Sequence, residues 1–242
     1  MKAQHLKIAG VADYFAAPVL SNSRLKGAVM KASPETLRTG QLLHMAVYEP
    51  EAFSSSPEHV AYTTTAVATP AARQMQQILR LAAVSRANPL VSHFLSSPAA
   101  VFEREIYALL TAVPGLPNKT AVPFRMKADG LLYTCPALLQ CKAAQDLKST
   151  ACKTKAAFLA TFDDYGYWMQ AHIYKLITGA KKFYFIGVSK SEPHLTFTVD
   201  VAQHPEKMAE AKRLFPMMLR RHIELNPEYL TTATDFIARH TA

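Results

Sequence analysis

Hydrophobic residues in the first hundred positions recur at intervals of three and four, the spacing typical of amphipathic helices. This pattern predicts one helix with Ser33 as its N-cap, Pro34 at its first position and Pro50 as its stop. A second, longer helix is predicted in "TPAARQMQQILRLAAVSRANP", which also opens on a Thr–Pro pair. Residues 53–68, rich in Ser, Thr and Ala, are expected to form the loop between them.

Beyond about residue 100 the chain changes to runs with a strand-like pattern, of which the last two are rich in aromatic and β-branched residues. These runs read "FEREIYALLT", "AVPFRMKADGLLY", "ALLQCKAAQDLK", "KFYFIGVSK" and "HLTFTVDV". Helical spacing returns between Thr154 and about Gly179, and again after Pro205. Strands and helices therefore alternate without a repeat or a clear linker, and the predicted fold class is α/β, a central sheet flanked by helices.

A single domain is expected to span residues 1–242, because half of the residues are hydrophobic and 19 % are charged, a balance typical of chains that fold around a core. Within it, residues 1–100 form a mainly helical N-terminal part, residues 101–203 the sheet core and residues 204–242 the C-terminal helices.

Composition also indicates which partner and which cellular compartment to expect. Lys and Arg number 27 against 18 Asp and Glu, a surplus that favours an anionic partner such as nucleic acid without identifying one. The three cysteines lack C-x-x-C spacing and match neither a disulfide framework nor a zinc site, which favours a reducing cytosol. Asp13 interrupts the apolar N-terminal run, and no stretch approaches the roughly 20 apolar residues that span a bilayer. We therefore expect a cytoplasmic protein without a signal peptide or a membrane contact.

Charged residues alternate at the ends of two neighbouring predicted strands. Arg125, Lys127 and Asp129 share one face of the first strand, and Asp146 and Lys148 share one face of the second. If the strands pair as a hairpin, the two carboxylates meet at the same edge of the sheet and repel one another unless a cation bridges them. Hard oxygen ligands suit Mg²⁺ or Mn²⁺. A plain ion pair at a strand end is the alternative reading of the same spacing.

Beside a metal ion, Lys148 could orient or, if neutral, deprotonate an attacking water, or it could neutralise charge that develops on a phosphate. Arg125 and Lys127, on the same face as the first acid, are candidates for contacts with nucleic acid. Ser21 and Ser23 precede or begin a short helix, where their hydroxyls could hold a terminal phosphate or simply cap the helix.

The order "KADG", "DLK" and "GYWMQAHIY" resembles the PD-(D/E)xK nuclease superfamily, and most of all its exonuclease VIII (RecE-type) and lambda-exonuclease branch. Upstream, "GQLLH" is similar to the G-x-x-x-H/E helix that precedes the sheet in that branch. The resemblance extends from about Leu20 to about Val201. It implies a restriction-endonuclease-like core, a central mixed β-sheet flanked by helices, with further helices at the N-terminus.

The resemblance also implies roles for individual residues. The groups that match metal ligands are His44, Asp129, Asp146 and the backbone carbonyl of Leu147. Lys148 matches the catalytic lysine, and Gln170 and Tyr174 match a Q-x-x-x-Y pair that supports this lysine and contacts DNA. The implied cofactor is Mg²⁺, which Mn²⁺ could replace.

The activity implied by the resemblance is that of an exodeoxyribonuclease, which digests linear double-stranded DNA from 5′ to 3′ and leaves single-stranded DNA for recombination. The implied partners are DNA ends, a single-strand annealing protein and further copies of the chain in a ring of three or four, in the cytosol of a bacterial or phage-infected cell. Two alternatives stay open: a nuclease-fold protein that binds DNA or a partner without cutting, and a structure-specific endonuclease.

Two acids in the predicted strand "FEREIYALLT" have no assigned role. Glu103 and Glu105 share a face of this strand with Tyr107, and they could lie near the site or at a solvated edge. The solvated edge is the expectation for Glu105.

Overall fold

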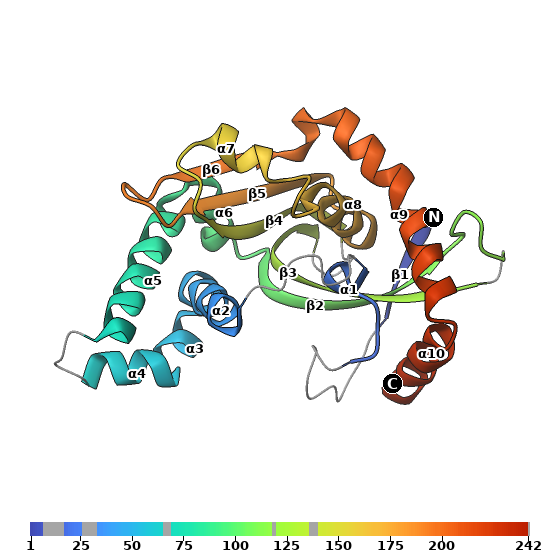
Figure 1. The fold of residues 1–242 in the computed structure, drawn as a ribbon, viewed down its shortest axis with the longest axis horizontal. Coiled ribbons are helices and arrows are strands. Elements are labelled where there is room, and N and C mark those ends of the chain that lie inside the picture. The colour runs from blue at the N-terminus through green and yellow to red at the C-terminus, as the bar shows by residue number, and fades with distance from the viewer. Residues whose placement is uncertain (7–16, 26–32, 65–68, 118–119, 136–139, 242) are drawn as a thin grey trace.

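The computed structural model describes residues 1–6, 17–25, 33–64, 69–117, 120–135 and 140–241. Helices lie on both faces of one six-stranded sheet (Figure 1). The strands are β1 (Lys2–Leu6), β2 (Ala100–Thr111), β3 (Val122–Cys135), β4 (Gln140–Thr150), β5 (Lys182–Ser189) and β6 (Thr196–Asp200).

The strands lie in the sheet in the order of the chain. β4 and β5 pair in parallel, whereas every other neighbouring pair is antiparallel. The parallel pair requires a crossover, which α7 (Lys155–Ala160) and α8 (Tyr167–Thr178) supply. This arrangement confirms the predicted class, a mixed sheet flanked by helices. β1 was not predicted; its short sequence "KAQHL" has little apolar alternation, and its position comes from pairing with β2.

The remaining helices lie between β1 and β2 or follow β6 in the chain. They are α1 (Asn22–Leu25), α2 (Pro34–Tyr48), α3 (Pro50–Ser54), α4 (Pro57–Thr64), α5 (Pro70–Ala87), α6 (Pro89–Ser96), α9 (Pro205–Leu225) and α10 (Tyr229–His240), with a 3₁₀ turn at Val201–Gln203. The predicted N-cap of α2 is confirmed, because the Ser33 hydroxyl accepts a hydrogen bond from the backbone N–H of Thr36.

One prediction about helices was wrong. Except for a turn at Ser55 and Ser56, residues 53–64 are helical rather than a loop, because Pro50 and Pro57 each occupy the first position of a new helix. The rest of the predicted loop, residues 65–68, lies outside the described part of the structure. A proline that stops one helix can thus start the next. The helical spacing between Thr154 and Gly179 corresponds to two helices, separated by a turn in which Gly166 has a φ of 58°.

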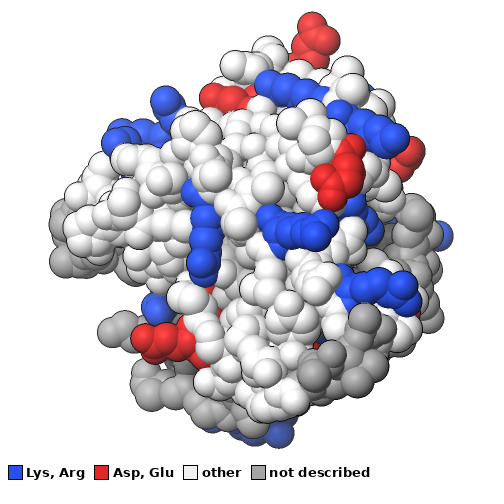
Figure 2. Space-filling model, turned by 90° about the vertical axis from the view of Figure 1, so that its left-hand side faces the viewer, with Lys and Arg blue, Asp and Glu red and all other residues white. Residues whose placement is uncertain are grey.

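The surface carries the excess of basic residues. Figure 2 shows Lys and Arg side chains distributed over one face of the molecule, with fewer acidic side chains among them. No helix within the described ranges is long and apolar enough to cross a membrane.

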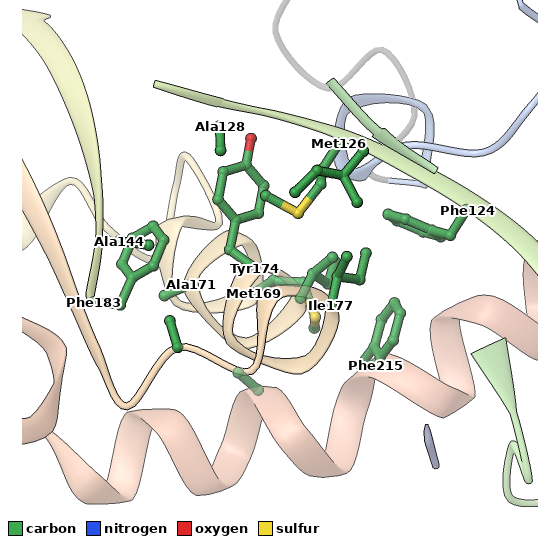
Figure 3. Packing of buried hydrophobic residues seen from close by; sticks show 14 of the residues in the cluster. Phe124, Met126, Ala128, Ala144, Met169, Ala171, Tyr174, Ile177, Phe183 and Phe215 are labelled. Atoms are coloured by element: carbon green, nitrogen blue, oxygen red, sulfur yellow. The ribbon is translucent and has the colours of Figure 1, made fainter. Parts of the chain in front are cut away.

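Each face of the sheet has its own hydrophobic core. Against one face, α8 and α9 pack on apolar residues of β3 such as Phe124 and Met126 (Figure 3). Against the other, α2 and α5 pack on Leu147 of β4 and on Ile186 and Val188 of β5. Successive residues of a strand point to opposite faces, so each central strand contributes to both cores.

A half-buried histidine that packs against the first of these cores makes stability depend on pH. Burial, together with Lys212 and Lys175, lowers the pKa of His172 to about 4. The unfolded chain therefore takes up the proton first, and stability is lost as pH falls from about 6.5 towards 4. Because the ring is partly exposed, we expect a loss of about 1–2 kcal/mol over this range. Urea unfolding at pH 7 and pH 4.5 should show a smaller pH-dependent loss in His172→Gln than in the wild type; equal losses would contradict the assignment.

Candidate metal centre and active site

The candidate site lies where β3 and β4 cease to pair. The described ladder between them ends at the pair Gly130–Gln145, one residue before the two acids. Beyond this point Asp129 Oδ2 accepts a hydrogen bond of 2.7 Å from the backbone N–H of Leu147. A carboxylate thus satisfies an amide that a backbone carbonyl would satisfy in a continuous sheet. The hairpin that brings the two acids to one region is as predicted.

The ladder on the other side of β3 is interrupted at the same level. β2 and β3 pair at Phe102–Gly130 and again at Arg104–Ala128, which leaves Glu103 opposite Asp129. Glu103 has a φ of 49°, in the left-handed region that a non-glycine residue rarely adopts. Such conformations cost of the order of 1–3 kcal/mol and occur most often at functional sites.

His44 projects from α2 toward this break. Its Nε2 lies 3.0 Å from the carbonyl oxygen of Leu147, and its Nδ1 lies 3.4 Å from Glu103 Oε1 and 3.5 Å from Asp129 Oδ1. Burial opposes the imidazolium charge, but the two carboxylates outweigh burial and raise the pKa of His44 to about 10. Since a metal ligand must be neutral imidazole, ion binding here requires the loss of this proton.

Asp146 and Lys148 form the second half of the site, on the side of α8. Gln170 Nε2 donates a hydrogen bond to Asp146 Oδ2, and the Lys148 ammonium lies against Asp146 Oδ1, 5.4 Å from the centre of the Tyr167 ring. Burial and the nearby Asp129 raise the pKa of Asp146 to about 6. Burial disfavours the charge of Lys148, but Asp146 raises the pKa of this lysine above its usual value. Lys148 is therefore a cation here, not a base.

Gln170 and Tyr174 lie one turn apart on α8, as predicted, and each makes a hydrogen bond to a strand that carries the site. Gln170 orients Asp146, and the Tyr174 hydroxyl donates a hydrogen bond of 2.7 Å to the carbonyl of Lys127. Figure 3 shows the Tyr174 hydroxyl directed toward β3 near Ala128. Both side chains are buried, so in this structure they act on the strands that carry the site. A contact between either residue and DNA stays a prediction.

Of the two basic residues predicted to contact nucleic acid, Lys127 is accessible and Arg125 is buried. Lys127 lines a pocket of about 310 Å³ beside the site, and its Nζ lies 2.9 Å from Glu103 Oε2. The expectation for Arg125 needs correction: this residue is 2 % exposed, and its Nε donates a hydrogen bond to the Val19 carbonyl. Alternation placed it on the right face of β3, but the chain around Val19 and Leu20 covers that part of the strand.

Ser21 and Ser23 lie at the start of α1, a helix of four residues. The carbonyl oxygen of Ser21 accepts a hydrogen bond from the backbone N–H of Leu25, so Ser21 is the residue from which this turn begins. The side chain of Ser23 lies outside the described part of the structure. A phosphate-binding role for either serine stays a prediction.

The residues of the site fit a hard divalent cation. His44, Glu103 and Asp129 each offer a ligand atom, and these atoms lie within 4.8 Å of one another. Glu103 Oε1 is buried and accepts no hydrogen bond from any described residue, so it has lone pairs directed at the cluster. Carboxylate oxygens with one imidazole suit Mg²⁺ or Mn²⁺. A ligand role for Asp146 and the Leu147 carbonyl, both adjacent to this cluster, stays a prediction.

Glu103 lies at the site although no sequence pattern identifies it as a member. Glu105, two positions along the same strand, is exposed as expected, whereas Glu103 is turned inward beside His44. The register between β2 and β3 could have identified Glu103. A pairing that sets residue 103 opposite Asp129 places the two acids side by side.

Comparison with solved structures supports the fold. A crystal structure from Eubacterium rectale, described as a candidate exonuclease, matches with a TM-score of 0.57 at 16 % identity, over 87 % of this chain and 73 % of that one. An alkaline exonuclease from Laribacter hongkongensis matches with a TM-score of 0.31 at 14 % identity, over 87 % and 93 % of the two chains. At 16 % identity the first likeness concerns the fold alone, and the second, with its TM-score of 0.31, adds no support. No curated protein sequence matches the chain significantly.

A family model gives the decisive match. Residues 17–226 match the model described as "PDDEXK-like domain of unknown function (DUF3799)", a range that includes every residue of the site described above. This match confirms the resemblance to the PD-(D/E)xK superfamily that the three short motifs indicate. On the combined basis of its mixed sheet, the acids and lysine at the β3–β4 break and this match, the chain belongs to the PDDEXK-like DUF3799 family.

Proposed function

We propose that this protein is a metal-dependent nuclease that hydrolyses phosphodiester bonds of DNA. The observation that supports the proposal most is the convergence of Asp129, Asp146 and Lys148 at one break in the sheet, with His44 above it on α2. Paired acids suit a divalent ion, and a charged lysine suits the negative charge that develops on a phosphate. Mg²⁺ is the proposed cofactor, with Mn²⁺ as a substitute.

The position of each residue indicates its proposed role. His44, Asp129, Asp146 and the Leu147 carbonyl would hold the ion, which when bound supplies an activated water and polarises the phosphate. Lys148 provides a fixed positive charge beside Asp146, suited to the negative charge that develops on the phosphate oxygens. Gln170, which binds the other oxygen of Asp146, keeps this carboxylate from rotating.

The proposed substrate is linear double-stranded DNA, digested from 5′ to 3′ to give single strands for recombination. The net charge of +9 suits a polyanionic substrate, and the motifs resemble those of the exonuclease branch described above. A single-strand annealing protein is the proposed partner, and a ring of three or four copies is the proposed assembly.

The purified protein should shorten linear duplex DNA only when Mg²⁺ is present, and should release a 5′ label before a 3′ label. A covalently closed circle of the same sequence serves as the control, because an enzyme that needs an end spares it. Gel electrophoresis of the labelled products distinguishes the outcomes. Cutting of the circle would replace the exonuclease with an endonuclease, and a gel shift without shortening at any Mg²⁺ concentration would contradict cleavage altogether.

A further inference from the structure

We propose that Glu103 is an additional ligand of the divalent ion, and that Lys127 is the cation that holds this carboxylate until the ion replaces it. This inference rests on the proposed function and specifies how the same site is loaded. It concerns two residues whose side chains meet only because β2 and β3 pair in the observed register.

The burial of Glu103 is the first argument. Its side chain is 10 % exposed, and its Oε1 receives no hydrogen bond from any residue in the described ranges. Removing a carboxylate oxygen from water without a hydrogen bond is costly. The imidazole of His44, 3.4 Å away, is the neighbour that this oxygen faces. An ion beside His44 and Asp129 would give this oxygen a closer partner than the imidazole is.

The backbone at Glu103 is the second argument. An extended residue at this point would continue the ladder with Asp129, whereas a φ of 49° interrupts it. The neighbouring pairs on both sides hold the strand in place, so the unusual conformation is imposed by the sheet rather than by a free loop. The sheet thus fixes the Glu103 carboxylate next to the Asp129 carboxylate before any ion arrives.

Lys127 explains how two adjacent acids are tolerated without the ion. Its Nζ lies 2.9 Å from Glu103 Oε2, the oxygen on the other side of the carboxylate from His44. The Lys127 side chain is 34 % exposed and lines the open pocket, so its ammonium can move into solvent without leaving a buried charge. A divalent ion and this ammonium compete for the same carboxylate. Neutralising Lys127 should therefore tighten ion binding, whereas neutralising Glu103 should weaken it.

Isothermal titration calorimetry with Mn²⁺ alone, in the absence of DNA, tests these opposite effects. Glu103→Gln should bind Mn²⁺ at least about 10-fold more weakly than the wild type. Its matched control is Glu105→Gln, which removes the same charge from an exposed position two residues away and should bind as the wild type does. Lys127→Met should bind Mn²⁺ about 3- to 10-fold more tightly than the wild type. Its matched control is Lys142→Met, at an exposed position on β4, which should bind Mn²⁺ as the wild type does.

The results of these titrations distinguish a failure of this inference from a failure of the proposed function. If Asp129→Asn loses Mn²⁺ binding while Glu103→Gln matches Glu105→Gln, Glu103 is not a ligand and the nuclease proposal is unaffected. If the wild-type protein binds no Mn²⁺, both proposals fail. Circular dichroism verifies that each variant is folded. Should Glu103→Gln not fold, the Lys127→Met titration decides, because unchanged or weaker binding in that variant would overturn the competition.

Discussion

Asp146→Asn is expected to reduce Mg²⁺-dependent cleavage of linear duplex DNA by roughly 1000-fold or more. Asparagine keeps the shape of the side chain and an oxygen for Gln170, but it removes the charge that holds the Lys148 ammonium and the charge proposed to bind the ion. Initial rates on end-labelled duplex, measured at saturating Mg²⁺, give the size of the effect.

Two opposing effects set the stability of the same variant. The pKa of Asp146 is raised to about 6 by burial and by Asp129, so the ionised carboxylate is less favourable in the folded protein than in the unfolded chain, and asparagine removes this cost. Asparagine also leaves the buried Lys148 ammonium without the carboxylate that it lies against, which opposes the gain. We therefore expect Tm, measured at pH 8 in a metal chelator, to stay close to the wild-type value. Lost activity with such a Tm would mark Asp146 as a residue kept for chemistry.

Exposed Asp164→Asn is the matched control for charge, and it should leave both rate and Tm near those of the wild type. Full cleavage by Asp146→Asn would contradict the proposed site. A large fall in Tm would instead show that the carboxylate has a structural role.

Phe215→Ala is expected to destabilise the protein by about 3–5 kcal/mol. Phe215 is fully buried between α9 and the sheet, where its ring meets the edge of Phe124 with centroids 5.9 Å apart (Figure 3). His172 of α8 lies on another side of the same ring, at 5.7 Å. Truncation would therefore leave a cavity bordered by two helices and a strand, none of which can close it alone. The midpoint of urea unfolding measures the loss.

Met217→Ala provides the comparison on the same helix. Met217 is 48 % exposed, so its truncation creates no cavity and should change the free energy of unfolding by no more than about 0.5 kcal/mol. Equal effects of the two substitutions would mean that α9 is not packed on the sheet as described.

Much of the candidate site could be predicted because its members obey simple periodicities. Asp146 and Lys148 alternate on a strand, and Gln170 and Tyr174 are one helical turn apart, so neighbours in space are also near neighbours in sequence. His44 could be placed only through the resemblance of "GQLLH" to a known motif, since nothing in α2 itself shows which element it faces.

Glu103 and Arg125 could not be assigned correctly, for two different physical reasons. Glu103 reaches the site through a left-handed backbone angle, which alternation along a strand cannot anticipate. Arg125 lies on the expected face, but a segment near the N-terminus, around Val19, covers it, and periodicity contains no information about such long-range contacts. The helices at Pro50 and Pro57 were missed because a proline signals a helix end and a helix start equally well.

The two hydrophobic cores on opposite faces of the sheet bear on how the catalytic groups stay aligned. His44 is anchored through α2 in one core, whereas Gln170 is anchored through α8 in the other, and the strands between them carry the acids. The distance between the His44 imidazole and the Gln170 amide thus depends on how closely α2 and α8 each pack on the sheet. A small change of volume in either core would shift one group relative to the other, so the geometry of the candidate site depends on the packing of both cores.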